Sequence, residues 1–300
     1  MSRVRCRVVV LTFNCADIIA QTLAQARRID PHPFVVDSFS SDRTAEQVGS
    51  EAQWVQRAFK NYGEQRNWAI AQVAPDCDWQ LHLDADEVLD DDAVTAINAV
   101  LDQGANASHQ AYLLRRVDYF MNRQLRHSGV NPWHLRLFRS GHGACENRLY
   151  DQHFVSDRPA GRLKGCMHDR NAVSLSDWTA RHNRWSDLEV AELLKGHQAS
   201  STSSGGSHAS AEGLLQGRLG GDPRERTRWL KGLYYRMPGG LRSTAYFLYR
   251  YVFRLGFLDG REGLYFAFLQ ALWFRLLVDA KMLEAQRAAG AQSAPPSSNP

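Results

Sequence analysis

The sequence predicts an α/β protein: an open sheet of alternating strands and helices, an antiparallel patch after it, and amphipathic helices towards the C-terminus. Three patterns support this fold class. Short apolar runs alternate with longer mixed segments from residue 7 to about 139, candidate strands without long helices between them extend to residue 168, and residues 242–281 form an aromatic, leucine-rich segment. With 300 residues, the chain can form one large domain or two small ones.

The candidate strands of the first part are short apolar runs that end at polar residues. They are RVVVLT, PFVVDS, AQWVQR and DWQLHLD. The segments between them predict helices at residues 17–28, 44–50, 64–73 and 90–101. Asp17 and Asp42 are expected to cap helices, because an aspartate side chain can accept hydrogen bonds from unpaired backbone N–H groups. This rhythm is typical of a nucleotide-type fold.

The second group of candidate strands lies at residues 111–119, 134–139, 150–155 and 161–168. Since no long helix separates these strands, we expect them to pair in an antiparallel patch. Residues 174–194 return to helical spacing. The Ser/Gly-rich run QASSTSSGGSHASA follows, and it predicts a flexible linker because it has little apolar surface to bury.

The aromatic segment at residues 242–281 has two possible interpretations. Its helices could pack as core on the main domain, or they could lie in a membrane interface with their arginines towards anionic headgroups. The density of Tyr, Phe and Trp favours the interface, because amphipathic rings suit the headgroup layer. No apolar run reaches the roughly 18 to 20 residues of a membrane span.

Composition narrows the class of protein further. The chain has 36 Lys and Arg against 32 Asp and Glu, so the charge of a dedicated nucleic-acid-binding protein is missing and we expect no nucleic-acid partner. The five cysteines are scattered without a CxxC pair, which indicates neither a disulfide framework nor a cysteine zinc site. The N-terminal apolar run is too short for a signal peptide. A cytoplasmic location fits these observations.

The most specific local signal is LHLDADEVLDDD, a strand that ends in Asp84, Ala85, Asp86 and Glu87. Carboxylates at the carboxyl end of a strand lie where open α/β sheets bind ligands. Their hard oxygens suit Mg²⁺ or Mn²⁺ shared with a phosphate. The alternative is a solvated turn, and the later run Asp90–Asp92 is assigned to a helix cap and first turn.

The order of these motifs resembles a known family. VVVLTFN, VVDSFSSDRT, NYGEQRNWAI and LHLDADE follow one another as in the family 2 glycosyltransferases of GT-A fold. The resemblance continues through WHLRLFR, ENRLYDQHF, GCMHDR and WTARHNRWSDLEVAELL. The C-terminal segment resembles that of bacterial lipopolysaccharide-core glucosyltransferases and related exopolysaccharide enzymes. The implied fold is a Rossmann-like nucleotide-binding sheet with an antiparallel acceptor-side patch, plus C-terminal amphipathic helices.

The resemblance also implies a division of the chain. A GT-A domain is expected at residues 1–196, with its nucleotide-binding half up to about residue 110 and its acceptor half at about 111–196. A flexible linker is expected at 197–221, a helical membrane-interface region at 222–284, and a disordered tail at 285–300.

Four residues match family positions that bind the nucleotide sugar. Thr12 and Asn14 match positions that line the nucleotide pocket. Asp37 matches the acidic residue that binds the base or ribose, although it could also be a cap in DSFSSDRT. Arg66 matches a basic residue that reaches the nucleotide, and its alternative is a surface arginine of a helix.

Three residues match the metal site of the family. The resemblance implies that Asp84 contacts the ribose or the metal, and that Asp86 is the direct ligand of a divalent cation, Mg²⁺ or Mn²⁺, that bridges the diphosphate. His168 in GCMHDR matches a late metal-binding histidine, but a lone histidine at a strand end is often structural.

The general base is expected in the segment ENRLYDQHF. Related sequences have a Glu in a VHE-type triplet, whereas this chain has Leu149, Tyr150 and Asp151. Asp151 is therefore one candidate for taking the acceptor proton, and Glu146 is the other.

The function implied is an inverting transfer of a hexose, with UDP-glucose as the expected donor. The expected acceptor is a glycolipid or lipid-linked oligosaccharide, and the enzyme would be peripheral on the inner face of the bacterial cytoplasmic membrane. Two alternatives stay open. One is an inactive membrane-associated scaffold, and the other is a sugar nucleotidyltransferase, although LTFNCAD lacks the glycine-rich phosphate loop expected of the latter.

Overall fold

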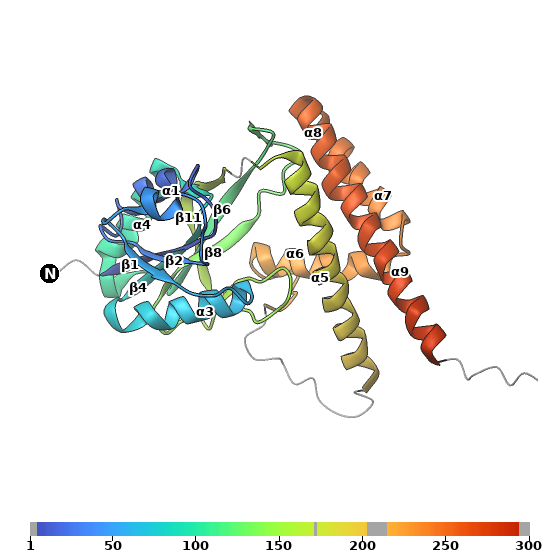
Figure 1. Cartoon of the computed structure of the whole chain (residues 1–300), viewed down its shortest axis with the longest axis horizontal. Coiled ribbons are helices and arrows are strands. Elements are labelled where there is room, and N and C mark those ends of the chain that lie inside the picture. The colour runs from blue at the N-terminus through green and yellow to red at the C-terminus, as the bar shows by residue number, and fades with distance from the viewer. Residues whose placement is uncertain (1–4, 171–172, 203–214, 294–300) are drawn as a thin grey trace, which may run out of the picture.

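The computed structural model describes residues 5–170, 173–202 and 215–293. A sheet with flanking helices forms one side of the molecule, and long C-terminal helices pack together on the other (Figure 1). The α/β prediction is confirmed.

The first half of the chain builds the parallel part of the sheet, as predicted. Its strands pair in the order β3-β2-β1-β4, all parallel. These strands are β1 (Cys6–Thr12), β2 (Phe34–Asp37), β3 (Gln53–Gln56) and β4 (Trp79–Asp84). The helices between and after them are α1 (Ile19–Ala26), α2 (Thr44–Val48), α3 (Tyr62–Val73) and α4 (Asp91–Gln103).

The second group of strands extends the same sheet. The order continues from β4 as β8-β6-β11-β5, and β7 pairs with β6. The bounds are β5 (Glu87–Leu89), β6 (Ala111–Phe120), β7 (Arg123–Gln124), β8 (Trp133–Arg139) and β11 (Ala160–Asp169). Pairing through β4, β8 and β6 is antiparallel as expected, but β6 and β11 are parallel, so the predicted patch is mixed.

The strand predicted at residues 150–155 is largely wrong. Only β10 (Phe154–Ser156) is extended, and it pairs with β9 (Gly143–Cys145) in a separate two-stranded sheet. Asp151 has a φ of 58°, which lies outside the extended region and ends any strand there. The carboxylate of Asp151 therefore sits on a loop.

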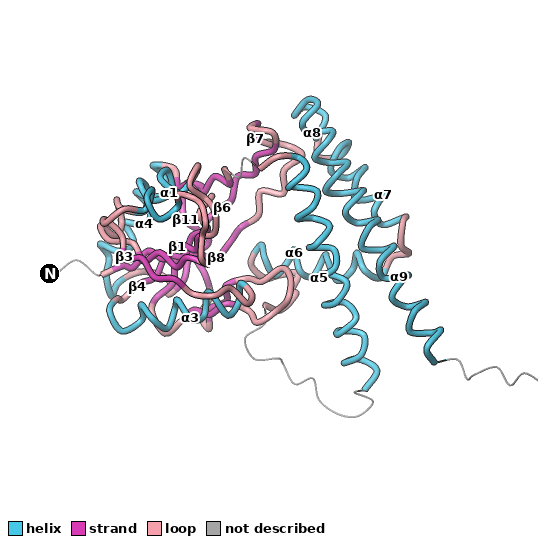
Figure 2. The backbone as a smooth tube through the Cα atoms, viewed as in Figure 1, coloured by secondary structure: helices cyan, strands magenta, loops and turns pink. Residues whose placement is uncertain are grey.

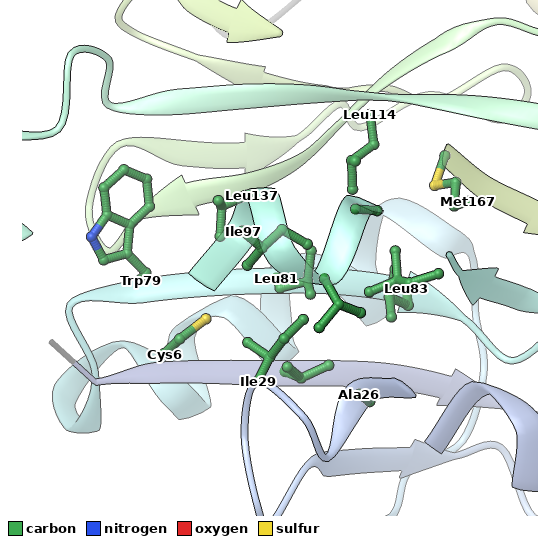
Figure 3. Packing of buried hydrophobic residues seen from close by; sticks show 14 of the residues in the cluster. Cys6, Ala26, Ile29, Trp79, Leu81, Leu83, Ile97, Leu114, Leu137 and Met167 are labelled. Carbon is green, nitrogen blue, oxygen red and sulfur yellow. The ribbon is translucent and has the colours of Figure 1, made fainter. Parts of the chain in front are cut away.

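The core lies between the sheet and the helices that cover it. Trp79, Leu81 and Leu83 of β4 are buried together with Leu137 of β8 and Ile97 of α4 (Figure 3). Both faces of the inner strands are covered, so β1 has the nearly continuous apolar run VVVL, whereas β4 (WQLHLD) alternates and buries Gln80 and His82 on its second face.

The predicted helix caps have different outcomes. Asp17 is not a cap: α1 begins at Ile19 without a side-chain cap. Asp42 accepts a hydrogen bond from the Thr44 N–H at 3.0 Å, where α2 starts. Asp90 caps α4 by accepting from the Ala93 N–H at 2.7 Å, which confirms its assignment as a cap.

The C-terminal part is helical. It comprises α5 (Leu175–Thr202), α6 (Pro223–Arg236), α7 (Leu241–Leu248), α8 (Gly260–Phe266) and α9 (Phe274–Ser293), with irregular helical turns at 249–259 and 267–273 joining the last three. Within the predicted linker, α5 continues to Thr202, residues 203–214 lie outside the described residues, and 215–221 form a loop. The predicted tail boundary at 285 falls inside α9; residues 294–300 lie outside the described residues.

One helix of the described part, Gly256–Ala289, is long and apolar enough to cross a membrane by length and composition. Only 33% of its apolar window is buried. Its inner face packs on the rest of the protein through Phe266, Phe274 and Val278. The core interpretation therefore holds for the inner face, and the membrane interface stays a prediction for the outer face.

The expected placement of arginines towards a membrane is wrong for most of the segment. Arg242 pairs with Asp279, and Arg275 lies 3.2 Å from Glu189 of α5. Arg250 is buried and donates to the Ser128 carbonyl. Arg242 and Arg275 thus have acidic partners within the helical packing, and Arg250 bonds to the loop between β7 and β8, in line with the high cost of a buried cation without a partner.

Candidate active site

Three parallel strands end at one edge of the sheet, and each carries a predicted site residue. β1 ends at Thr12, β2 at Asp37 and β4 at Asp84. Thr12 is the register partner of Asp37, and Leu11 that of Asp84. The fold thus brings these residues to the edge where open α/β sheets bind ligands.

Asp37 is fully buried beneath this edge. Its carboxylate accepts from the Thr12 hydroxyl at 2.9 Å, the Ser40 N–H at 2.8 Å and the Gln56 amide at 3.2 Å. The Ser40 hydroxyl donates a further hydrogen bond at 2.5 Å. Asp37 and Thr12 therefore shape the edge from within, and neither is a helix cap.

Asn14 lies on the exposed loop after β1, with a φ of 46°. Its side-chain oxygen accepts from the Ser41 N–H at 2.8 Å, and its own N–H donates to the Ser40 hydroxyl at 2.8 Å. These bonds join the loops after β1 and β2. Among the predicted pocket residues Thr12, Asn14 and Asp37, Asn14 is the one at the surface.

Asp84 is held by two arginines. Arg66 of α3 donates to both carboxylate oxygens, at 2.6 and 2.9 Å, and Arg136 of β8 donates at 3.1 Å. Burial opposes ionisation, but the charges of Arg66 and Arg136 outweigh it and hold the pKa of Asp84 below its usual range. Arg66 is buried, so its alternative as a surface helix arginine is wrong.

Asp86 has the opposite environment only two residues later. Burial and the nearby negative charges of Asp169, Asp84 and Glu87 raise its pKa to about 8. Its backbone carbonyl accepts from the Arg170 N–H at 2.9 Å, which fixes the turn against the end of β11. The carboxyl group of Asp86 therefore lies among an excess of negative charge, which a bound cation would offset.

Two further acidic side chains complete this cluster: Glu87, which the sequence analysis placed in the acidic run without a role of its own, and Asp169, which it missed. Glu87 is buried; one of its oxygens accepts from Arg136 and the other from the Asp84 N–H at 3.1 Å. Asp169, at the end of β11, lies 3.7 Å from Arg116 of β6. Glu87 and Asp169 stand beside predicted residues in DADE and GCMHDR, and that adjacency was the available signal.

His168 points to different partners. Its ring lies 3.0 Å from the Tyr119 hydroxyl and 3.7 Å from Asp90. Successive side chains of a strand face opposite sides, so Asp169 rather than His168 shares a side with Asp86. The role of His168 as a metal ligand stays a prediction without a contact to support it.

No cluster of three or more His, Cys, Asp or Glu ligands occurs within residues 5–170, 173–202 and 215–293. Mg²⁺ is nevertheless often bound by one or two carboxylates together with substrate phosphates. Asp86, next to Asp84 and Asp169, supplies the hard oxygens of such a set. The residues present therefore fit a divalent cation that a diphosphate would help to hold.

The two candidates for the general base are clearly different. Glu146 is fully buried and accepts from Arg228 at 2.5 Å, the Leu215 N–H at 2.8 Å and the His153 N–H at 2.9 Å. Both of its oxygens are thus engaged within the protein. This geometry assigns Glu146 to holding the loop that precedes β10.

Asp151 presents a partly open carboxylate, with 39% of its side chain exposed. It lies 3.1 Å from Lys231 of α6 and 3.4 Å from His153. Burial opposes ionisation, yet Lys231 and His153 outweigh it and hold the pKa of Asp151 well below its usual range. Asp151 is therefore ionised and accessible, as a base must be.

Lys231 connects this loop to the helices. It lies 2.9 Å from Glu189 of α5, which is also bonded by the Tyr235 hydroxyl at 2.6 Å and by Arg275. A separate hollow of about 580 Å³ lies away from these residues. It is lined by His109 and His142, among others, and none of the predicted site residues lines it.

With this geometry in place, comparison with known proteins identifies the family. The family model of glycosyl transferase family 2 matches residues 7–157, half of the chain. The chain belongs to glycosyl transferase family 2. The fold is therefore GT-A, and the enzyme class is a glycosyltransferase. No curated protein shows significant similarity to the chain.

Solved structures give weaker similarities. S. aureus TarS 1-349 is 15% identical with a TM-score of 0.40, over 93% of this chain and 92% of that one. Glucosyl-3-phosphoglycerate synthase from Mycobacterium tuberculosis, in complex with Mn²⁺, UDP and phosphoglyceric acid, is 16% identical with a TM-score of 0.30. That match covers 38% of this chain and 43% of the synthase, so less than half of the synthase is spanned.

Proposed function

We propose that this glycosyltransferase moves a hexose, with glucose the first candidate, from a UDP-sugar to a glycolipid or lipid-linked oligosaccharide with inversion at the anomeric carbon. The observation that carries the proposal is the pair of aspartates at the end of β4. Asp84 is neutralised by two arginines, whereas Asp86 is crowded by negative charge.

The donor would bind across the carboxyl edge of the parallel strands. Asp86, with Asp84 and Asp169 beside it, would hold Mg²⁺ or Mn²⁺ against the diphosphate. Such a cation offsets the negative charge that develops on the leaving diphosphate. Asn14 and the buried Asp37 network would form the nucleotide side of the pocket.

Asp151 would act as the base. The acceptor hydroxyl attacks the anomeric carbon from the face opposite the diphosphate, and its proton passes to the Asp151 carboxylate. The bond between the anomeric carbon and the diphosphate oxygen breaks, and the nucleoside diphosphate leaves with the electron pair. The ionised, half-open state of Asp151 supports this role, and the engaged carboxylate of Glu146 does not.

A lipid-linked acceptor, such as a lipopolysaccharide core or an exopolysaccharide intermediate, is proposed from the C-terminal resemblance. The outer face of the C-terminal helices supports it, because it exposes large apolar side chains such as Leu241, Tyr265 and Phe268. A peripheral site on the inner face of the cytoplasmic membrane is part of the same proposal.

The test is a panel of nucleotide sugars with Mn²⁺ or Mg²⁺, read by thermal shift and by donor hydrolysis. A bound donor raises the apparent stability by mass action. We expect a UDP-sugar to raise the melting temperature only when the metal is present, and to be hydrolysed slowly. Binding without hydrolysis or transfer would instead indicate an inactive scaffold, and no binding of any nucleotide sugar would refute the proposal.

A further inference from the structure

The turn between α7 and α8, residues 249–258, exposes an unusual number of large apolar side chains. We call this segment the elbow. Its exposed residues are Tyr249 (52%), Val252 (46%), Phe253 (76%), Leu255 (45%), Phe257 (46%) and Leu258 (54%). Six large apolar side chains exposed within ten residues are uncommon on a soluble monomer, and exposed apolar groups of this kind mark interaction sites.

The elbow is a built feature. Leu255 has a φ of 58°, which turns the chain sharply between the two helices. A Cβ on the buried Gly256 would come within 2.7 Å of the Arg250 carbonyl, so the turn closes tightly on itself. The apolar side chains therefore face outward on a compact, fixed backbone.

The elbow is also fastened to the catalytic domain. The buried carboxylate of Asp259 accepts from the backbone N–H groups of Arg126 at 3.1 Å, His127 at 2.9 Å and Ser128 at 2.7 Å. Glu262 pairs with Arg123 of β7 at 3.0 Å. Figure 2 shows β7 beside the start of α8, in agreement with these bonds.

Three arginines lie in the elbow or next to it. Arg126 and Arg261 are exposed and Arg254 is half-buried, and none of the three has an ion pair within the described ranges 5–170, 173–202 and 215–293. Asp259 and Glu262 bring two negative charges to this part of the chain, against five positive charges from Arg123, Arg126, Arg250, Arg254 and Arg261, so its net charge is positive.

We propose that the elbow inserts into the headgroup layer of an anionic lipid bilayer. Apolar and aromatic side chains ringed by arginines suit partial burial at the boundary between headgroups and acyl chains. A second copy of the chain fits less well, since a two-fold contact through the elbow would bring two positively charged surfaces together.

The loop that holds the elbow is also connected to the candidate active site by a chain of bonds. Asp118 of β6 accepts from the Val130 N–H at 2.7 Å and pairs with Arg116 at 3.0 Å. Arg116 in turn lies 3.7 Å from Asp169, whose charge acts on Asp86. The loop that holds the elbow is thus bonded to the metal-side cluster. The benefit for a membrane-bound acceptor rests on the proposed function, whereas the docking itself does not.

The test uses the full chain and sedimentation with vesicles of phosphatidylcholine, with and without phosphatidylglycerol. We expect binding only to the anionic vesicles and its weakening by salt, which screens the arginines. The double variant Phe253→Ser with Phe257→Ser should bind at least about tenfold more weakly, since each ring loses its apolar burial. Arg126→Gln with Arg261→Gln should lose about fivefold per arginine.

Phe59→Ser is the matched control, because Phe59 is as exposed as Phe257, at 46%, but lies outside the elbow. Phe59→Ser should bind like the wild type.

Circular dichroism checks the fold of each variant, and the arginine pair keeps the test valid should the phenylalanine pair misfold. Equal binding to neutral and anionic vesicles would overturn the proposal, as would wild-type binding by both elbow variants. A dimer in solution that the phenylalanine pair abolishes, without vesicle binding, would assign the elbow to a second copy instead. None of these readouts needs a donor, so failure here is separate from failure of the proposed reaction.

Discussion

The donor side and the acceptor side of the candidate active site treat the same residue type in opposite ways. At the end of β4, negative groups crowd Asp86 and raise its pKa to about 8. On the loop before β10, Lys231 and His153 outweigh burial and hold the pKa of Asp151 well below its usual range. When their environments shift the pKa values of two carboxyl groups in opposite directions, the two groups often have different chemical roles.

The difference also lies in where the compensating charges originate. The donor side takes its cations from the α/β part of the chain: Arg116 and Arg136 from strands β6 and β8, and Arg66 from helix α3. The acceptor side takes its cations from α6, where Arg228 meets Glu146 and Lys231 meets Asp151. The C-terminal helices therefore supply cations to the candidate active site, in addition to exposing an apolar outer face.

The largest expected effect tests Asp151 as the base. Asp151→Asn should lower the rate of sugar transfer by about 10²- to 10⁴-fold, because the amide cannot accept the acceptor proton. Binding of the UDP-sugar, measured by thermal shift, should remain nearly unchanged. Normal transfer by this variant would remove the distinction between the two sides and reopen the choice of base.

The next effect tests Asp86 on the donor side. Asp86→Asn should reduce transfer by about 100-fold or more, the scale of losing one main electrostatic stabiliser. The melting temperature should stay unchanged or rise, because the amide removes repulsion from Asp169, Asp84 and Glu87. Excess EDTA should abolish wild-type transfer, and full activity in EDTA would contradict the donor-side assignment.

The donor side could be predicted from the sequence because its residues follow strand ends. Thr12, Asp37 and Asp84 each close an apolar run, and parallel strands bring such positions to one edge. The strands and helices of this half could be predicted too, because short apolar runs alternate there with mixed helical segments. The missed partner Arg136 is 52 residues from Asp84, and only the antiparallel pairing of β8 with β4 brings it there.

The acceptor side and the helices could not be predicted in this way. Lys231 is 80 residues from Asp151, and no local pattern connects them. In the aromatic segment, composition could not separate an inner face from an outer one, so Arg250 was placed at a membrane although it is buried. Hydrophobic patterns indicate that a helix has an apolar side, but the number of sides covered depends on tertiary packing.

A stability measurement separates Glu146 from Asp151. Glu146→Gln should lower the free energy of unfolding by about 3 kcal/mol, since it leaves a buried ion pair without its acid. Glu192→Gln is the control, because Glu192 pairs with Arg148 at 3.0 Å with 22% of its side chain exposed, and it should cost about 1 kcal/mol or less. Urea unfolding of both variants gives the comparison. A stable Glu146→Gln protein that cannot transfer sugar would make Glu146 the base.

The smallest expected effect concerns Lys231, which we expect to tune Asp151. Asp151 works as a base only while ionised, so activity falls as the pH drops through its pKa. Lys231 lowers that pKa, so in Lys231→Met the pKa rises and activity is lost at a higher pH. The high-pH plateau should change by less than about tenfold, well below the loss from removing the base.

Glu189 keeps Arg275 and Tyr235 as partners, so the helices should stay packed in this variant. Lys281→Met, which removes a lysine paired with Asp187 near the surface, should leave the pH profile of kcat/KM where it is. An unchanged profile in Lys231→Met would show that this lysine only holds the helices together, and that the acceptor side does not owe its ionised carboxylate to α6.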